Sequence, residues 1–307
     1  MKIDWDVIAE ATAQTSPARL RISAIRFLNP APLMWDFEHP PEMDRLAARY
    51  QIHQSMPAAC AAELADGTAD IGLIPIAAYA TTPGLAIIPG CTIASLDKVR
   101  SILLVVKDPD GLGADGLRKV RRVAADTASR TSNAYAQVIF RKFYGTSPKF
   151  VPHDPDLDAM LADCDATVLI GDPALLALED KDVRFERTGE QLAYLDLAEE
   201  WKRHTDAAWV SAFWAVRPEA LKACGVSARQ VTDDFVQSRD HGMANIEHLV
   251  QEWAPRMPVS SSTIRTYLSK NIHYTLDEDC IAGIELFFRY AAECGVQPAA
   301  PALRFLR

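Results

Sequence analysis

Residues 71–76 read Ile-Gly-Leu-Ile-Pro-Ile, a short run without a single charged side chain. Such a run predicts a strand that is buried on both faces, which is typical of a parallel sheet covered by helices. Upstream of it, residues 50–55 predict a strand, and residues 57–64 predict a helix that begins at Pro57 and ends before Gly67. Strand, helix and strand follow one another as in a βαβ unit, so we expect an α/β protein.

Strands and helices alternate in two separate parts of the chain. Residues 20–25 and 100–106 predict two further strands, and the turn-rich stretch at 108–113 follows the second. Strands and helices then alternate again up to residue 170, and residues 209–216 predict a strand that returns the chain to its first half. Three helical segments are predicted after this strand, over residues 226–253, 261–268 and 277–294.

This order of elements predicts two lobes, of which the first is larger and is formed by two separate pieces of the chain. Residues 19–105 together with 207–307 are expected to form the first lobe, and residues 106–206 an inserted second lobe, while residues 1–18 form an N-terminal arm. The layout resembles the two-lobed type 2 periplasmic-binding-protein fold, with its ligand cleft between the lobes. In open α/β sheets the ligand lies beyond the carboxyl ends of the strands, so residues that directly follow strands are the candidates for a site.

The composition excludes several classes of function. The net charge of −9 argues against a protein that binds nucleic acid or a membrane surface, because phosphate contacts need a basic face. Without a run of about 18 apolar residues, membrane insertion is not expected either. The first residues, Met-Lys-Ile-Asp, carry an acid where a secretion signal would be basic and then apolar, so we expect a cytoplasmic protein.

Cysteines and histidines are scattered along the sequence. The six cysteines form no C-x-x-C pair and the seven histidines form no H-E-x-x-H motif, so we expect neither disulfides nor a metal site. The cysteines are instead predicted to be small buried thiols. Neither common Gly-rich phosphate loop is present, and no cofactor is expected.

The most informative stretch, residues 126–133, reads Asp-Thr-Ala-Ser-Arg-Thr-Ser-Asn. It follows a predicted strand and opens a predicted helix, and the free N–H groups at the start of a helix bind carboxylate or phosphate. Ser129, Thr131 and Ser132 add hydroxyl groups, and Arg130 can bind a carboxylate through two hydrogen bonds. Capping the helix would need only one of these hydroxyls, so the stretch predicts an anion site.

Two further polar residues stand next to predicted strands. Asn29 directly follows the first strand; its amide can orient a hydroxyl or carboxylate, or can cap the helix that begins near Pro30. Ser101 stands at the start of a buried strand, where its hydroxyl can equally bond the backbone.

Three other residues have ordinary structural explanations beside functional ones. Asp172 precedes Pro173 at a predicted helix start, where an aspartate usually caps the helix. Tyr79 either lines the cleft or packs in the core. His153 is the best-placed histidine, but the sequence offers it no partner. Trp209 and Trp214 are expected in the core.

Seven stretches, in this order along the chain, carry a resemblance to a known family: residues 21–33, 69–75, 99–104, 129–132, 167–172, 196–202 and 213–217. They resemble the menaquinone-biosynthesis enzymes of the futalosine pathway, a family that contains chorismate dehydratase and 1,4-dihydroxy-6-naphthoate synthase. The stretches fit the dehydratase branch better than the synthase branch.

The resemblance implies a small dicarboxylate, chorismate, as the ligand, and loss of water from it as the reaction. It also implies that Asn29 and Ser101 face the substrate as catalytic residues and that the Ser129–Ser132 turn binds a carboxylate. Asp172 and Tyr79 are further candidates for substrate binding. The proton acceptor is open between the substrate's own carboxylate, Asp172 and His153.

One stretch departs from the family pattern. Residues 205–211 read Thr-Asp-Ala-Ala-Trp-Val-Ser where relatives usually have Thr-Gly-x-Pro-Phe-Val-Phe. The difference concerns the hinge and the shape of the pocket, and not the fold. Two alternatives to the dehydratase also stay open: a synthase-like enzyme with a histidine in the cleft, and a binding protein without catalysis.

Overall fold

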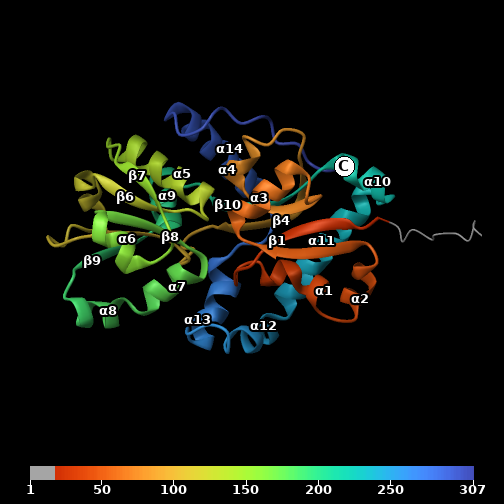
Figure 1. Cartoon of the computed structure of the whole chain (residues 1–307), viewed down its shortest axis with the longest axis horizontal. Coiled ribbons are helices and arrows are strands. Elements are labelled where there is room, and N and C mark those ends of the chain that lie inside the picture. The colour runs from red at the N-terminus through yellow and green to blue at the C-terminus, as the bar shows by residue number, and fades with distance from the viewer. Residues whose placement is uncertain (1–17) are drawn as a thin grey trace, which may run out of the picture.

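The computed structural model describes residues 18–307, and Figure 1 shows them arranged as two lobes side by side. Each lobe contains one five-stranded sheet with helices packed on it. The predicted two-lobed α/β architecture is therefore confirmed. Apart from Ala18, the predicted arm over residues 1–18 lies outside the described residues.

The first sheet has the strand order β2-β1-β3-β10-β4. Its members are β1 (Leu20–Ile25), β2 (Tyr50–Ser55), β3 (Ile71–Pro75), β4 (Ala86–Ser95) and β10 (Trp209–Val216). The first three run parallel, as the βαβ pattern predicted, with helix α3 (Pro57–Asp66) connecting β2 to β3. The returning strand β10 lies antiparallel between β3 and β4.

The second sheet repeats this plan with the order β7-β6-β8-β5-β9. Its members are β5 (Ile102–Lys107), β6 (Arg122–Asp126), β7 (Lys149–His153), β8 (Ala166–Ile170) and β9 (Leu192–Asp196). Strand β5 lies antiparallel between β8 and β9, in the place that β10 has in the first sheet. The chain therefore enters the second sheet before β5, whereas residues up to 105 were expected in the first lobe; a buried apolar strand has the same pattern in either sheet.

Two strands had no counterpart among the predicted elements. Strand β4 contains Pro89 and Gly90, and its pairing with β10 shifts register between Ile87 and Thr92. This irregularity interrupts the pattern by which a strand is recognised in a sequence. Strand β9 is short, and its first four residues are only half-buried.

Helices cover both sheets and form most of the chain after β10 (Figure 1). Beside α3 they are α1 (Trp35–Glu38), α2 (Glu42–Ala47), α4 (Ile76–Tyr79), α5 (Arg130–Val138), α6 (Leu157–Asp163), α7 (Gly171–Glu179), α8 (Lys181–Thr188), α9 (Leu197–Thr205), α10 (Pro218–Cys224), α11 (Ala228–Ala244), α12 (Ile246–Trp253), α13 (Ser261–Thr266) and α14 (Glu278–Glu293). Short 3₁₀ helices occur at Ala31–Met34 and Gly113–Lys119, and π-helical turns at Ile139–Phe143 and Tyr267–Asn271. The predicted helix over residues 226–253 is divided at Asn245 into α11 and α12.

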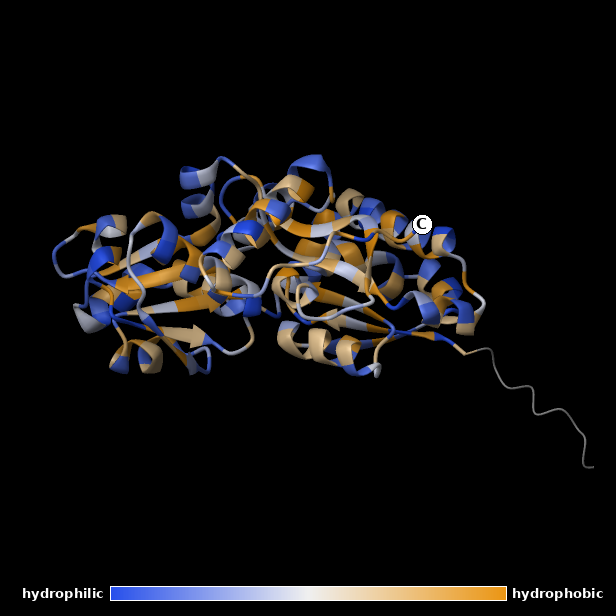
Figure 2. Cartoon of the chain, turned by 90° about the horizontal axis from the view of Figure 1, so that it is seen from above, coloured by the Kyte–Doolittle hydropathy of each residue, from blue (hydrophilic) through white to orange (hydrophobic). Residues whose placement is uncertain are grey.

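Apolar residues are concentrated in the strands of both lobes, whereas the helices alternate between apolar and polar residues (Figure 2). An aromatic stack joins the lobes. The wholly buried Tyr135 of α5 has its ring 3.8 Å from that of Trp209 in β10 and 4.1 Å from that of Phe287 in α14. Trp209 and Trp214 are buried, as predicted. The stack fixes the orientation of α5 relative to the first lobe.

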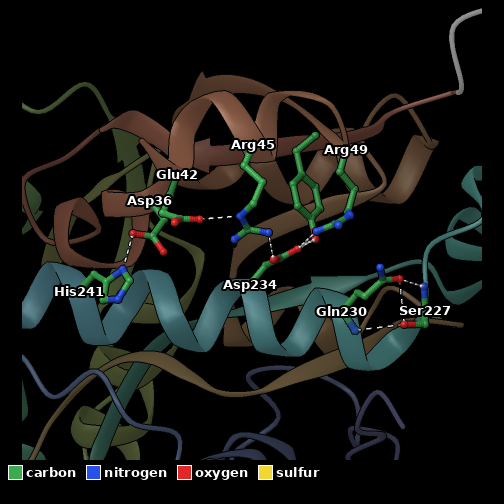
Figure 3. A network of polar contacts seen from close by, with 9 residues as sticks. Asp36, Glu42, Arg45, Arg49, Ser227, Gln230, Asp234 and His241 are labelled. Carbon is green, nitrogen blue, oxygen red and sulfur yellow. Dashed lines mark hydrogen bonds and ion pairs between the residues drawn. The ribbon is translucent and has the colours of Figure 1, made fainter. Parts of the chain in front are cut away.

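Polar contacts fasten α11 to the first lobe along its length (Figure 3). At its start, Ser227 and Gln230 form a capping box. In the middle, the buried carboxylate of Asp234 accepts hydrogen bonds from Arg45, Arg49 and the hydroxyl of Tyr50. Near its end, His241 Nδ1 lies 2.8 Å from the buried Asp36 carboxylate. The helix thus bridges α1, α2 and β2.

The segment after α14 covers the outer edge of β4. Ile87 N–H donates to the carbonyl of Arg304 (2.7 Å), and Leu306 N–H donates to the carbonyl of Ile87 (2.8 Å). The hydroxyl of Tyr79 donates to the carbonyl of Ala302 (3.2 Å) and accepts from the N–H of Arg304 (2.9 Å). These bonds tie the segment to both β4 and α4.

Within residues 18–307 no helix has the length and apolarity needed to cross a membrane. Four of the cysteines, Cys60, Cys91, Cys164 and Cys280, are buried as predicted, whereas Cys224 and Cys294 are half-buried.

The contact between α11 and the 3₁₀ helix at 31–34 generates a stability prediction. A Cβ atom on Gly242 would lie 2.0 Å from the carbonyl oxygen of Pro32, so the two backbones would have to separate. We expect Gly242→Ala to lower the free energy of unfolding by about 2 kcal/mol or more, as overpacked sites do. Gly116→Ala is the matched control, because its nearest neighbour would be 3.7 Å away. Urea unfolding of both variants checks this; equal losses would contradict it.

Candidate functional site

A cavity lies between the two lobes, at the carboxyl ends of the parallel strands. Its empty volume is about 460 Å³, counting the open mouth. One part of the wall is apolar and is formed by Ile25, Phe27, Ile93, Ile102 and Ile170. The polar part is formed by Asn29, Ser129, Arg130, Thr131, Ser132 and Ser211. The wall therefore offers an apolar part to a ring and a polar part to a charged group.

The start of α5 forms the polar wall of the cavity. Ser129, Thr131 and Ser132 are buried, whereas Arg130 is exposed. Although Ser129 occupies the N-cap position, its hydroxyl bonds none of the helix N–H groups in the described chain. Thr131 Oγ1 accepts a hydrogen bond from the N–H of Ala77 in the other lobe (3.1 Å). The helix N–H groups, two serines and Arg130 thus remain for an anion.

Asn29 reaches the cavity from the first lobe, just beyond β1. Its amide oxygen Oδ1 is buried and has no hydrogen-bond partner within residues 18–307. Buried polar atoms in native proteins nearly always have a partner. An acceptor left unpaired in a cavity wall is suited to a ligand that carries a hydroxyl or N–H group.

Ser101 is wholly buried and does not line the cavity. Its hydroxyl oxygen accepts a hydrogen bond from the hydroxyl of Tyr267, 2.7 Å away. Burial raises the pKa of Tyr267, and its side-chain hydrogen bonds with Ser101 and Asn29 oppose this rise. Tyr267 therefore connects Ser101 to Asn29, and Ser101 can act on a ligand only through these neighbours.

Asp172 joins the lobes beside the cavity instead of lining it. Its Oδ1 accepts a hydrogen bond from the N–H of Leu28 in the first lobe (3.2 Å), and burial raises its pKa to about 6. The preceding Gly171 has φ 62°, and a Cβ there would lie 2.8 Å from the ring of Phe27. A glycine is required at this position for both reasons.

Two candidates from the sequence are not brought to the cavity. Tyr79, expected as a substrate-binding residue, is buried, and its hydroxyl bonds the segment after α14. His153, at the end of β7, has Nδ1 2.8 Å from the carbonyl oxygen of Asp154 and does not line the cavity. Their side chains are engaged with the backbone at other places in the fold.

The departure from the family pattern has a local structural consequence. Asp206 adopts φ 54°, the left-handed conformation that glycine adopts without cost and for which relatives have Gly. Ser211, where relatives have an aromatic residue, lines the cavity and accepts a hydrogen bond from Trp209 Nε1 (2.7 Å). The smaller side chain leaves more room on this side of the cavity.

Tyr267 and the apolar residues of the cavity wall were not predicted from the sequence. Tyr267 lies 166 positions from Ser101, and a tyrosine in a helical segment has the pattern of an ordinary core residue. Phe27 stood inside a stretch that the resemblance covers, but its position gave no sign that it meets Gly171.

Two mixed sheets with a cleft between them define the class of two-lobed proteins with the periplasmic-binding-protein fold. The chain is similar to a protein from Archaeoglobus fulgidus (15% identity, 91% of this chain and 98% of that one, TM-score 0.66). It is also similar to the periplasmic aliphatic sulphonate binding protein SsuA from Escherichia coli (15%, 95% and 96%, TM-score 0.61). A third similar structure is the alkanesulfonate-binding protein SsuA from Xanthomonas axonopodis pv. citri bound to MOPS (15%, 94% and 96%, TM-score 0.62). At this identity the likeness shows the fold alone.

The family of the chain is shown by its sequence. The chain belongs to the menaquinone biosynthesis family, whose model matches residues 20–293. The match extends over both lobes and includes every residue of the cavity wall.

The raised pKa of Asp172 predicts a pH-dependent stability. The folded state holds this proton more tightly than the unfolded state, in which an aspartate has a pKa near 4, so stability decreases as pH rises from about 4 to about 6. Asp172→Asn stays neutral and can still accept from Leu28. Its melting temperature relative to the unchanged protein should therefore rise between pH 4 and pH 7. A difference that does not vary with pH would contradict this.

Proposed function

We propose that the protein is a chorismate dehydratase, which eliminates water from chorismate to give 3-[(1-carboxyvinyl)oxy]benzoate in menaquinone biosynthesis. The observation that carries the proposal is the composition of the cavity wall. The start of α5 with Arg130 lies on one side, and the unpaired Oδ1 of Asn29 on the other. Chorismate is a dianion with a six-membered ring and a hydroxyl group, and each of these features has a matching part of the wall.

The start of α5 would bind the ring carboxylate. The proton that chorismate loses is vinylogous to this carboxylate, so its removal gives an extended dienolate whose charge develops there. The N–H groups of the first turn, the Ser129 and Ser132 hydroxyls and Arg130 stabilise that charge, because they are oriented before the reaction begins. Expulsion of the neighbouring hydroxyl then makes the ring aromatic.

Proton transfer would depend on the substrate itself. The residues that line the cavity, all within the described range 18–307, include no histidine, aspartate or glutamate. The enolpyruvyl carboxylate of chorismate is therefore our choice for the base. The same group returns the proton to the departing hydroxyl, so that one water leaves. Asp172 is the alternative base, since it adjoins Gly171 of the wall and has a pKa of about 6.

Asn29 and Tyr267 would set the geometry of the leaving group. Oδ1 of Asn29 accepts a hydrogen bond from the substrate hydroxyl and so orients it. Tyr267 and Ser101 hold the amide in place from behind, which makes both of them positioning residues. Such an arrangement holds the reacting groups in one geometry.

A binding protein without catalysis is the second candidate, because similar folds include sulphonate-binding proteins. A synthase-like enzyme would need a histidine in the cavity, and His153 does not line it. Product formation separates the dehydratase from the binding protein.

Purified protein is expected to convert chorismate into an aromatic product, followed by absorbance. Asn29→Ala should lower turnover by about 100-fold or more, as loss of an oriented polar group does, with little change in melting temperature. Asn245→Ala, which removes an amide far from the cavity, should keep normal turnover. Binding of chorismate without product would favour the binding protein, and a near-normal rate for Asn29→Ala would remove Asn29 from the mechanism.

Tyr267→Phe tests the positioning role. Loss of the hydroxyl leaves Ser101 without its donor and Asn29 without its neighbour, so we expect kcat to fall about tenfold or more while KM changes little. Tyr274→Phe is the matched control, because the buried Tyr274 hydroxyl has no partner in the described chain. Steady-state kinetics of both variants test this role. Equal kcat values for Tyr267→Phe and Tyr274→Phe would show that Tyr267 only packs.

A further inference from the structure

Two histidines and a glutamate meet on the first lobe, outside the cavity between the lobes. His39 follows α1, and His248 and Glu252 stand one turn apart on the same face of α12. One nitrogen or oxygen atom of each residue lies within 4.8 Å of the other two. None of the three lines the cavity, so the cluster is separate from the proposed reaction.

Each ring nitrogen of His39 has one polar neighbour. Its Nδ1 lies 3.0 Å from the carbonyl oxygen of Trp35, which can only accept, so Nδ1 carries a proton. Its Nε2 lies 3.3 Å from Glu252 Oε2, and an ionised carboxylate can also only accept. The Nε2 and Oε2 atoms therefore share either a proton, as in an ion pair, or a metal ion to which both can bind. Histidines that bind metals are oriented in the same way, with the second nitrogen donating to a backbone carbonyl.

The distances match those of a shared tetrahedral ion. Ligand atoms bound at 2.0–2.1 Å to a tetrahedral zinc ion are about 3.4 Å apart, close to the 3.3 Å between His39 and Glu252. Two imidazoles on one such ion have centroids about 5 Å apart, and the rings of His39 and His248 are 5.5 Å apart at 89°.

Neighbouring side chains hold the three residues in this arrangement. The indole of Trp35 stacks on His39 at 3.9 Å and meets the ring of His248 edge-on at 5.2 Å. The second oxygen of Glu252, Oε1, accepts a hydrogen bond from Arg256 (2.9 Å). Such outer contacts are the usual way in which proteins orient metal ligands.

We propose that His39, His248 and Glu252 form a binding site for a divalent transition-metal ion of the zinc type, with water as the fourth ligand. Imidazole and carboxylate are common zinc ligands, and three protein ligands with one open position is an established arrangement. The ion would fasten α12 to the segment after α1. The sequence indicates no metal site because His39 and Glu252 are 213 positions apart and form no short metal-binding motif.

A second group of similar composition, His273, Asp277 and Cys280, has a different explanation. Asp277 Oδ1 caps α14 by accepting from Cys280 N–H (2.9 Å), and Oδ2 lies 2.7 Å from His273 Nε2. Burial raises the pKa of the Cys280 thiol, which disfavours the thiolate that a metal needs. This group stabilises the start of α14.

Calorimetric titration of the chelator-treated full chain with zinc chloride tests the proposal, together with melting curves. The protein should bind one zinc ion per chain and melt at a higher temperature with zinc. His248→Ala removes one ligand from an exposed position and should weaken binding by at least about tenfold, a loss that even outer-shell changes produce. His53→Ala is the matched control, since this exposed histidine lies on β2, and its zinc affinity should equal that of the unchanged protein.

Three outcomes would overturn the proposal. The first is that zinc does not bind, which would make His39 and Glu252 a simple ion pair. The second is that His248→Ala binds zinc as tightly as the unchanged protein, which would assign the ion to another site such as the half-buried thiols of Cys224 or Cys294. The third is an equal loss of affinity in His53→Ala.

Discussion

Where β1 and β3 end, the chain leaves the first sheet and the backbone N–H groups of Leu28 and Ala77 lose their partners in it. Both N–H groups are bound by side chains of the other lobe, Asp172 at the start of α7 and Thr131 at the start of α5. Because a buried N–H group without a partner is costly, these two bonds set how the lobes face each other. This placement of the lobes sets the shape of the cavity and brings the start of α5 towards Asn29.

Two wholly buried tyrosines complete the arrangement from behind the cavity. Tyr135 is sandwiched between Trp209 and Phe287 and holds α5 against the first lobe. Tyr267 bonds Ser101 and neighbours Asn29, and so fixes the opposite wall. In both cases a buried tyrosine ring supports a polar part of the cavity wall, the start of α5 or Asn29. The hydroxyl of each tyrosine is kept away from bulk water.

The features that the sequence predicted correctly are those that depend on local patterns. The strand over residues 71–75 and the helix that opens at residues 129–132 follow from runs of a few residues, and so does the position of Asn29 just after a strand. The irregular strand β4 and the sheet that holds β5 depend on pairing with distant segments, which a single sequence does not display. Tyr267 and the His39–Glu252 contact were missed for the same reason, since only the folded chain brings their partners together.

The segment at 302–306 illustrates what such long-range pairing does for a sheet. It occupies the side of β4 that faces away from β10. A strand with an open side can recruit a strand from another molecule, which is the first step of self-association. By pairing with Ile87, the chain's own backbone covers this part of the β4 edge, and Tyr79 holds the covering segment in place. The two hydrogen bonds of the Tyr79 hydroxyl thus link the cover of this edge to α4, the short helix that follows β3.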